Sequence, residues 1–125
     1  MKTKAIARPL RVAALLAGCA LLAACAAGPK SLYQWESYQA QVYSYLKNDG
    51  GDPQKQIAAL EEGLEKIRAK GNQAPPGYHA QLGMLYAATG HTDQMVKEFQ
   101  TEKQLFPESA SYMDFLMAKQ KKQGA

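Results

Sequence analysis

The chain has 125 residues and a net charge of +4, so it has room for one small domain and carries an excess of basic side chains. All of that excess lies in the first 24 residues, which contain no acidic residue and four basic ones: Lys2, Lys4, Arg8 and Arg11. The other eleven basic residues balance the eleven acidic residues. Because phosphate binding needs a basic face that persists in the finished protein, this distribution argues against a nucleic-acid partner.

The first segment is predicted to be a secretory leader. Its basic residues precede an apolar run from Val12 to Ala24, which only Gly18 and Cys19 interrupt. The run is shorter than the roughly 20 apolar residues needed to span a bilayer. The pattern therefore favours a cleaved signal peptide over residues 1–24 rather than a membrane helix.

The leader ends at Leu22-Ala23-Ala24-Cys25, which resembles the bacterial lipobox. In that motif small residues precede a cysteine that is lipidated and becomes the new N-terminus. A competing match ends at Cys19, but cleavage there would leave an apolar tail on the mature chain, so we favour lipidation of Cys25. With Ala26 rather than an aspartate after the cysteine, the resemblance implies a lipid-anchored protein on the periplasmic face of the outer membrane.

Residues 25–30 form a predicted tether, and helical spacing of apolar residues begins after it. We expect a first helix from Ser31, acting as the N-cap, to about Lys47. Its apolar stripe consists of Leu32, Trp35, Tyr38, Val42 and either Tyr45 or Leu46. The turn residues at 48–51 then end this helix.

A second helix is predicted from Pro53, with Asp52 as its N-cap, to a stop at Gly71. Its charges run from acidic to basic, which suits the helix dipole, and include an i, i+4 pair between Glu62 and Lys66. Its buried stripe is spaced by three and four residues and comprises Ile57, Leu60, Leu64 and Ile67.

Three more helices are expected, and no stretch combines strict alternation with strand-forming residues. The third spans about Tyr78 to Thr89, stops at Gly90 and buries Leu82, Leu85 and Tyr86. The fourth is capped by Thr92 or Asp93, stops at Pro107 and buries Met95, Val96, Phe99 and Phe106. The last starts at Ser109, buries Tyr112, Phe115 and Leu116, and frays into a polar tail at 119–125. The predicted fold class is all-α, with helical hairpins over residues 31–118.

The third and fourth predicted helices resemble one tetratricopeptide repeat. The landmarks that carry the resemblance are Leu82, Gly83, Tyr86, Gly90, Phe99 and Pro107. Gly83 would allow close helix approach, Gly90 the turn, and Phe99 contact with the next helix. Met95 and Glu102 stand where the repeat usually has a small alanine, which predicts irregular stacking. Because one repeat cannot bury its own face, the first hairpin and the last helix are predicted to cap it.

Over nearly all of residues 25–117, the mature chain resembles a family of uncharacterised bacterial lipoproteins. The resemblance is carried above all by residues 30–38 (KSLYQWESY) and 105–110 (LFPESA). It implies company with a lipoprotein similar to the curli secretion channel and with another small lipoprotein, and therefore an envelope assembly. It implies no reaction and supplies no catalytic residue.

The residues themselves predict neither a catalytic site nor a cofactor. His79 and His91 are twelve residues apart, which excludes the i, i+4 zinc pair of a helix. Cleavage at Cys25 leaves no second cysteine for a disulfide or metal site. The acidic cluster Glu61, Glu62 and Glu65 is interpreted as a solvated helix face. A cell-wall enzyme would need His79 and acidic neighbours to converge in a pocket.

Aromatic residues are dense near the tether, where five of them fall within thirteen positions. A small core could take all five. Alternatively, some form a partner surface, since aromatic residues are enriched in interfaces; contact with lipid headgroups is a third reading. The candidate partner-binding residues are Tyr33, Trp35, Tyr38 and Tyr43.

Together these observations predict a non-enzymatic, lipid-anchored adaptor that binds envelope proteins. One alternative is a pilot-like chaperone that carries a channel subunit to the outer membrane. A cell-wall enzyme is the other alternative.

Overall fold

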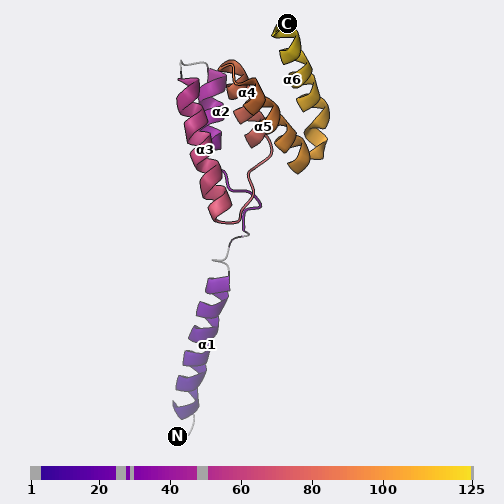
Figure 1. Ribbon diagram of the computed structural model, residues 1–125. Coiled ribbons are helices and arrows are strands. Elements are labelled where there is room, and N and C mark those ends of the chain that lie inside the picture. The colour runs from indigo at the N-terminus through magenta and orange to yellow at the C-terminus, as the bar shows by residue number, and fades with distance from the viewer. Residues whose placement is uncertain (1–3, 25–27, 29, 48–50, 125) are drawn as a thin grey trace. The chain divides into compact units, whose positions relative to one another are not determined.

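The computed structural model describes residues 4–24, 28, 30–47 and 51–124 (Figure 1). These residues form six α-helices and one short 3₁₀ helix, η1, and no strand occurs among them, which confirms the all-α prediction. The helices are α1 (Lys4–Ala24), α2 (Tyr38–Lys47), α3 (Pro53–Ala69), α4 (Tyr78–Ala88), α5 (Thr92–Leu105), η1 (Pro107–Ser109) and α6 (Ala110–Gln123). The chain divides into two units, Met1–Ser31 and Leu32–Ala125, of which the second holds α2 to α6.

The first unit contains α1, which covers most of the predicted leader. Cys19 lies on α1 with its thiol exposed. Within the part of the chain that the structure describes, no helix has the length and apolarity required to cross a bilayer. The predicted lipidation site, Cys25, lies outside the described residues.

Helix α2 begins at Tyr38, seven residues later than the sequence predicts, so Ser31 is not its N-cap. Hydrogen bonds to distant residues hold the preceding segment in a non-helical conformation. The Gln34 backbone N–H donates to the Gln73 backbone carbonyl at 3.0 Å, and the Ser37 hydroxyl donates to the Ala59 backbone carbonyl at 3.2 Å. Leu32 and Trp35 of the predicted stripe are exposed. Of the two alternatives at its end, Tyr45 packs against the core and Leu46 is exposed.

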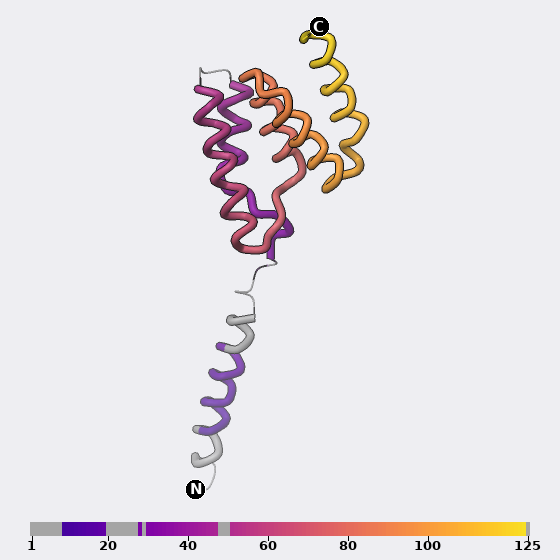
Figure 2. Tube along the Cα trace, viewed as in Figure 1, coloured from indigo at the N-terminus to yellow at the C-terminus, as the bar shows by residue number. Residues whose placement is uncertain are grey.

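The core lies between α3, α4 and α5, which run side by side in the second unit (Figure 2). The Asp52 carboxylate accepts a hydrogen bond from the Gln54 amide at 3.0 Å and caps α3 as predicted. All four residues of the predicted α3 stripe are buried: Ile57, Leu60, Leu64 and Ile67. Tyr78 of α4 packs against them and donates its hydroxyl hydrogen to the Leu60 carbonyl at 2.7 Å.

Helices α4 and α5 form the hairpin that carries the repeat-like residues. Leu82, Tyr86 and Phe99 are buried in it. A Cβ atom added to Gly83 would lie 2.5 Å from Cε1 of Phe99, so glycine is needed for this approach. Gly90 has a φ angle of +79°, which glycine adopts without strain, and it forms the turn between the helices. Pro107 follows the end of α5 and cannot continue its hydrogen bonding.

Glu102 was expected to disturb packing, and its carboxylate instead joins two helices. It is 2% exposed, and its oxygens accept hydrogen bonds from the Gly77 amide at 2.6 Å and the Ala80 amide at 3.3 Å. Both amides lie at the start of α4, where the first N–H groups have no partner within the helix and the dipole favours a negative charge. Glu102 of α5 therefore caps α4.

Helix α6 departs from its predicted pattern. It continues to Gln123, so the residues expected to fray are helical. Tyr112 and Phe115, predicted to be buried, are 56% and 59% exposed, and Met113 is the buried residue. Leu116 and Met117 are partly buried against the core. The α5 prediction has the same kind of error at Val96, which is 36% exposed, because α6 does not cover this part of α5.

Candidate functional site

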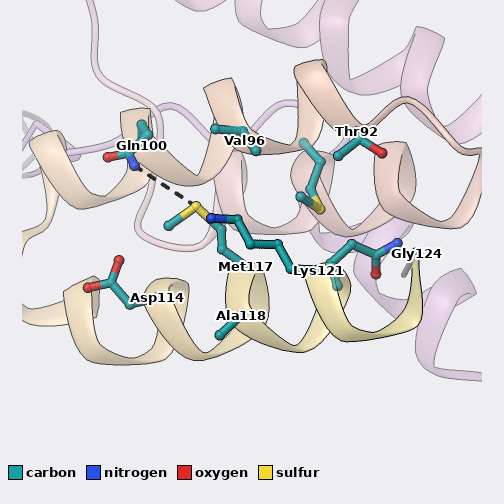
Figure 3. A pocket seen from close by; sticks show the side chains of 10 residues that line it. Thr92, Val96, Gln100, Asp114, Met117, Ala118, Lys121 and Gly124 are labelled. Carbon is teal, nitrogen blue, oxygen red and sulfur yellow. Dashed lines mark hydrogen bonds between the residues drawn. The ribbon is translucent and has the colours of Figure 1, made fainter.

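The candidate site is an open groove between α5 and α6, with a volume of about 580 Å³. Figure 3 shows its two walls, with Thr92, Val96 and Gln100 on α5 and Asp114, Met117, Ala118 and Lys121 on α6. Met95 is buried at its base. Its middle is apolar because Met95, Val96, Met117 and Ala118 all line it. We call this the α5–α6 groove.

The connection between α5 and α6 explains why the two helices face each other. Pro107 ends α5, and the 3₁₀ turn Pro107–Ser109 reverses the chain, with the Ser109 hydroxyl donating to the Phe106 carbonyl at 2.7 Å. Phe106 is buried and Tyr33 contacts its ring edge-on, with centroids 6.1 Å apart. The turn is therefore held against the domain.

Polar and charged groups from both helices lie beside the apolar residues of the groove. Lys103 of α5 forms an ion pair with Asp114 of α6. One helical turn further along α6, the Gln100 side chain lies 3.9 Å from the Met117 sulfur, the contact drawn in Figure 3. Beyond Met117 the lining includes Lys121, whose side chain extends in the space between the two helices (Figure 3). The groove thus combines apolar walls with a neutralised carboxylate and an ammonium group.

Sequence reasoning missed this groove because it assigned Tyr112 and Phe115 to the core. Met113, Leu116, Met117 and Gln120 form the i, i+3, i+4, i+7 series that faces α5, and all of them are at least partly buried. This series was a signal that could have identified the correct face of α6.

The predicted aromatic residues do not form one surface. Trp35 stacks on Tyr38 and Tyr38 stacks on Tyr78, with centroid separations of 6.1 Å and 5.1 Å. Burial and the nearby Glu102 carboxylate raise the pKa of Tyr38. Tyr33 lies apart on Phe106, and Tyr43 is exposed with the Lys47 ammonium group 5.6 Å from its ring centroid. Tyr38 and Tyr33 therefore contribute to packing, whereas Trp35 and Tyr43 present surface.

A second, polar hollow lies over α3, α4 and α5 and is lined by Glu61, Glu65, Tyr86 and Glu98 among others. The Tyr86 hydroxyl donates to the Glu61 carboxylate. Burial raises the pKa of Tyr86, and the hydrogen bond to Glu61 and the charges of Glu61 and Glu98 raise it further. The Tyr86 phenol is therefore held protonated as a hydrogen-bond donor.

His79 does have the acidic neighbour that the enzyme alternative requires. Its Nδ1 atom lies 2.6 Å from the Glu98 carboxylate. The His79 side chain is 7% exposed, however, and does not line the polar hollow. The pair joins α4 to α5 within the packed domain. Among residues 4–24, 28, 30–47 and 51–124, no three potential metal ligands gather in one place.

The family described as "Domain of unknown function (DUF4810)" matches residues 32–116. The match covers well over half of the chain and extends from α2 through the first half of α6. The chain therefore belongs to this family. Searches of curated proteins and of solved structures found no significant match.

Proposed function

We propose that this protein is a lipid-anchored periplasmic adaptor that binds envelope proteins through the α5–α6 groove. The acyl chains on Cys25 hold it to the outer membrane, and the helical domain does the binding. Its expected company, implied by the resemblance noted above, is a lipoprotein similar to the curli secretion channel and another small lipoprotein.

The observation that carries the proposal is the composition and shape of the groove. Two helices form its walls, and Val96, Met117 and Ala118 give those walls an apolar middle. Helix-binding proteins commonly receive the apolar face of a partner helix in a groove of this kind. The ammonium group of Lys121 adds a preference for an acidic residue in the partner segment.

Helix α6 supports the same role on its outer side. Tyr112 and Phe115 stack with ring centroids 6.3 Å apart and are both exposed. Tyrosine is enriched at protein interfaces, and a stacked pair offers a rigid apolar surface at little cost in conformational entropy. Because α6 also forms one wall of the groove, a partner bound there would lie on the same helix as this pair.

The test is affinity capture of the lipidated protein from intact envelopes after crosslinking. Ala118→Trp places a large ring in the groove, where residue 118 is exposed and lines the wall. Ala58→Trp is the matched control, because Ala58 is an exposed alanine on α3, away from the groove. We expect Ala118→Trp to lose the captured envelope protein and Ala58→Trp to retain it.

Equal capture by both variants would show that the α5–α6 groove is not the binding surface. Mass spectrometry of the same preparation tests the anchor. We expect an acylated N-terminal Cys25, and an unmodified Cys25 that still follows its leader would overturn the proposed location.

A further inference from the structure

We propose that the end of the domain nearest the tether docks on the bilayer surface through Leu32, Trp35 and Lys70, and that it prefers anionic headgroups. The inference rests on the lipid anchor of the proposed function and adds the orientation of the domain. In this orientation the α5–α6 groove faces away from the membrane.

The first step concerns apolar exposure at the start of the domain. Leu32 is 83% exposed, and Trp35 is 41% exposed. Such side chains are costly in water, whereas tryptophan is enriched where headgroups meet hydrocarbon because its ring is apolar and its N–H is polar. The exposed pair therefore suits a lipid–water interface.

The second step concerns the rigidity of this segment. Trp35 stacks on Tyr38, and the Gln34 backbone donates to the Gln73 carbonyl. In addition, the Asn72 side-chain amide donates to the Gln34 side-chain oxygen at 2.7 Å. The segment is thus fastened to the connection between α3 and α4, and Leu32 and Trp35 are presented by a folded surface.

The third step concerns the charge at the same end. Asn72 and Gln73 follow shortly after α3, which has Lys66 and Arg68 in its last turn and Lys70 as its C-cap. Lys66 pairs with Glu62 at 2.7 Å, and Arg68 pairs with Glu65 at 3.0 Å. Among the residues that the structure describes, no acidic group lies within ion-pair distance of Lys70. Its ammonium group is therefore the one at this helix end that remains available to lipid phosphates.

The fourth step is the reach of the tether. Leu32 follows the predicted lipidation site, Cys25, by seven residues. At a maximum of about 3.6 Å per residue, such a tether spans at most roughly 25 Å. The acyl chains therefore keep Leu32 close to the headgroups, so a weak surface affinity is sufficient for docking.

The orientation follows from the arrangement within the second unit. The segment before α2 lies at the same end as the connection between α3 and α4, whereas the C-terminal end of α6 lies at the opposite end (Figure 1). Lys121 and Gly124 of the groove belong to that opposite end. Docking through Leu32 and Trp35 would leave the groove open to a partner in the periplasm.

Trp35 is the only tryptophan in the chain, so its fluorescence reports on this surface alone. The full-length gene is expressed, and the protein is purified from envelopes and reconstituted into vesicles of phosphatidylglycerol and phosphatidylcholine in roughly equal amounts. Part of the phosphatidylcholine carries brominated acyl chains, which quench tryptophan on contact. We expect the bromolipids to reduce Trp35 emission roughly twofold, and we expect less quenching in vesicles without phosphatidylglycerol.

Two variants with matched controls test the residues. Lys70→Gln is compared with Lys55→Gln, because both lysines are exposed and lie near opposite ends of α3. Leu32→Ser is compared with Leu46→Ser, because Leu46 is 74% exposed but lies at the far end of α2. We expect Lys70→Gln to lower the ratio of docked to undocked protein about fivefold, and Leu32→Ser to lower it as well. Neither control variant should change quenching.

Each outcome bears on the proposal, and the mass of the purified protein separates its failure from that of the anchor. Acylated Cys25 with Trp35 quenched, and the variants behaving as stated, supports the docked orientation. Acylated Cys25 without quenching of Trp35 overturns docking but leaves the adaptor proposal in place. The same conclusion follows if Trp35 is quenched but Lys70→Gln and Leu32→Ser do not reduce the quenching. If Trp35 fluorescence is unaffected by bromolipids and changes only when an envelope protein is added, the surface binds that protein, and docking on the bilayer is overturned. An unacylated protein removes both the anchor and the docking that rests on it.

Discussion

Helices α4 and α6 differ sharply in how much of their surface the domain covers. Seven of the eleven residues of α4 are buried, whereas Met113 is the only buried residue among the fourteen of α6. Helix α4 has α3 on one side and α5 on the other, while α6 packs on α5 and η1. The comparison teaches that the free energy of folding is concentrated around α4 and that α6 contributes little buried surface to it.

The largest difference in stability between the two regions is expected when one aromatic ring is removed from each. Phe99 of α5 is 2% exposed and fills the space left by Gly83 of α4. We expect Phe99→Ala to lower the free energy of unfolding by about 3–5 kcal/mol, since it removes buried apolar surface and leaves a cavity. Urea denaturation followed by circular dichroism measures this change.

Phe115→Ala is the control, because Phe115 is an exposed phenylalanine on α6. Its free energy of unfolding should stay within about 0.5 kcal/mol of wild type. If the two substitutions had equal effects, stability would not be concentrated around α4.

A smaller effect is expected from Glu102, which caps α4 from α5. Glu102→Ala leaves the partly buried Gly77 and Ala80 backbone amides without their acceptor. We expect a loss of about 1–3 kcal/mol in the free energy of unfolding, the usual cost of buried donors left unsatisfied. Thermal unfolding monitored at the helix signal tests this loss.

Glu108→Ala provides the comparison, because Glu108 is an exposed glutamate in η1. Glu102→Gln should fall between wild type and Glu102→Ala, since an amide retains one acceptor oxygen. A Glu102→Ala protein as stable as wild type would mean that the cap contributes nothing.

The smallest effect is a dependence of stability on alkaline pH. Burial, together with the charge of Glu36, raises the pKa of Tyr78 from 10.0 to about 12. Between these two values the unfolded state loses the phenol proton while the folded state keeps it. The stabilisation is therefore complete below pH 10.0 and is lost as pH rises toward about 12. Urea denaturation at a series of pH values in this window measures the slope.

Tyr78→Phe should reduce that slope and, at neutral pH, cost about 0.5–1.5 kcal/mol through loss of the hydrogen bond to the Leu60 carbonyl. Tyr112→Phe is the control, because Tyr112 is an exposed tyrosine on α6. This substitution should leave the slope unchanged. An identical slope in wild type and Tyr78→Phe would contradict the assignment of this effect to Tyr78.

Local pattern was sufficient to predict that α3, α4 and α5 exist. The predicted cap of α5 was wrong, because the helix already begins at Thr92 and His91, not Thr92 or Asp93, occupies the N-cap position. The Asp52 cap, the α3 stripe from Ile57 to Ile67 and the turn at Gly90 all depend on neighbours within a few residues, and the structure has each of them. Spacing also identified Gly83 as a point of close helix approach. It assigned Phe99 to a contact with the next helix, whereas the structure packs the Phe99 ring against Gly83 of the preceding one.

The groove could not be predicted in the same way. Periodicity tells which side of a helix is apolar, but it does not tell whether another helix covers that side. Two faces of α6 have apolar residues at helical spacing, one with Tyr112 and Phe115 and the other with Met113 and Met117. Packing against α5 selected the second face and left the first exposed.

The sequence by itself therefore determined the helical class, the central helices and, apart from Val96, the buried residues predicted for them, because short-range spacing encodes them. Only the tertiary structure decided that residues 31–37 are not helical, that Glu102 caps α4, and that α5 and α6 leave a groove between them. The physical reason is that these features depend on hydrogen bonds and packing between residues far apart in the chain. The Gly77–Glu102 and Gln34–Gln73 contacts each join separate elements, and no local pattern contains both partners.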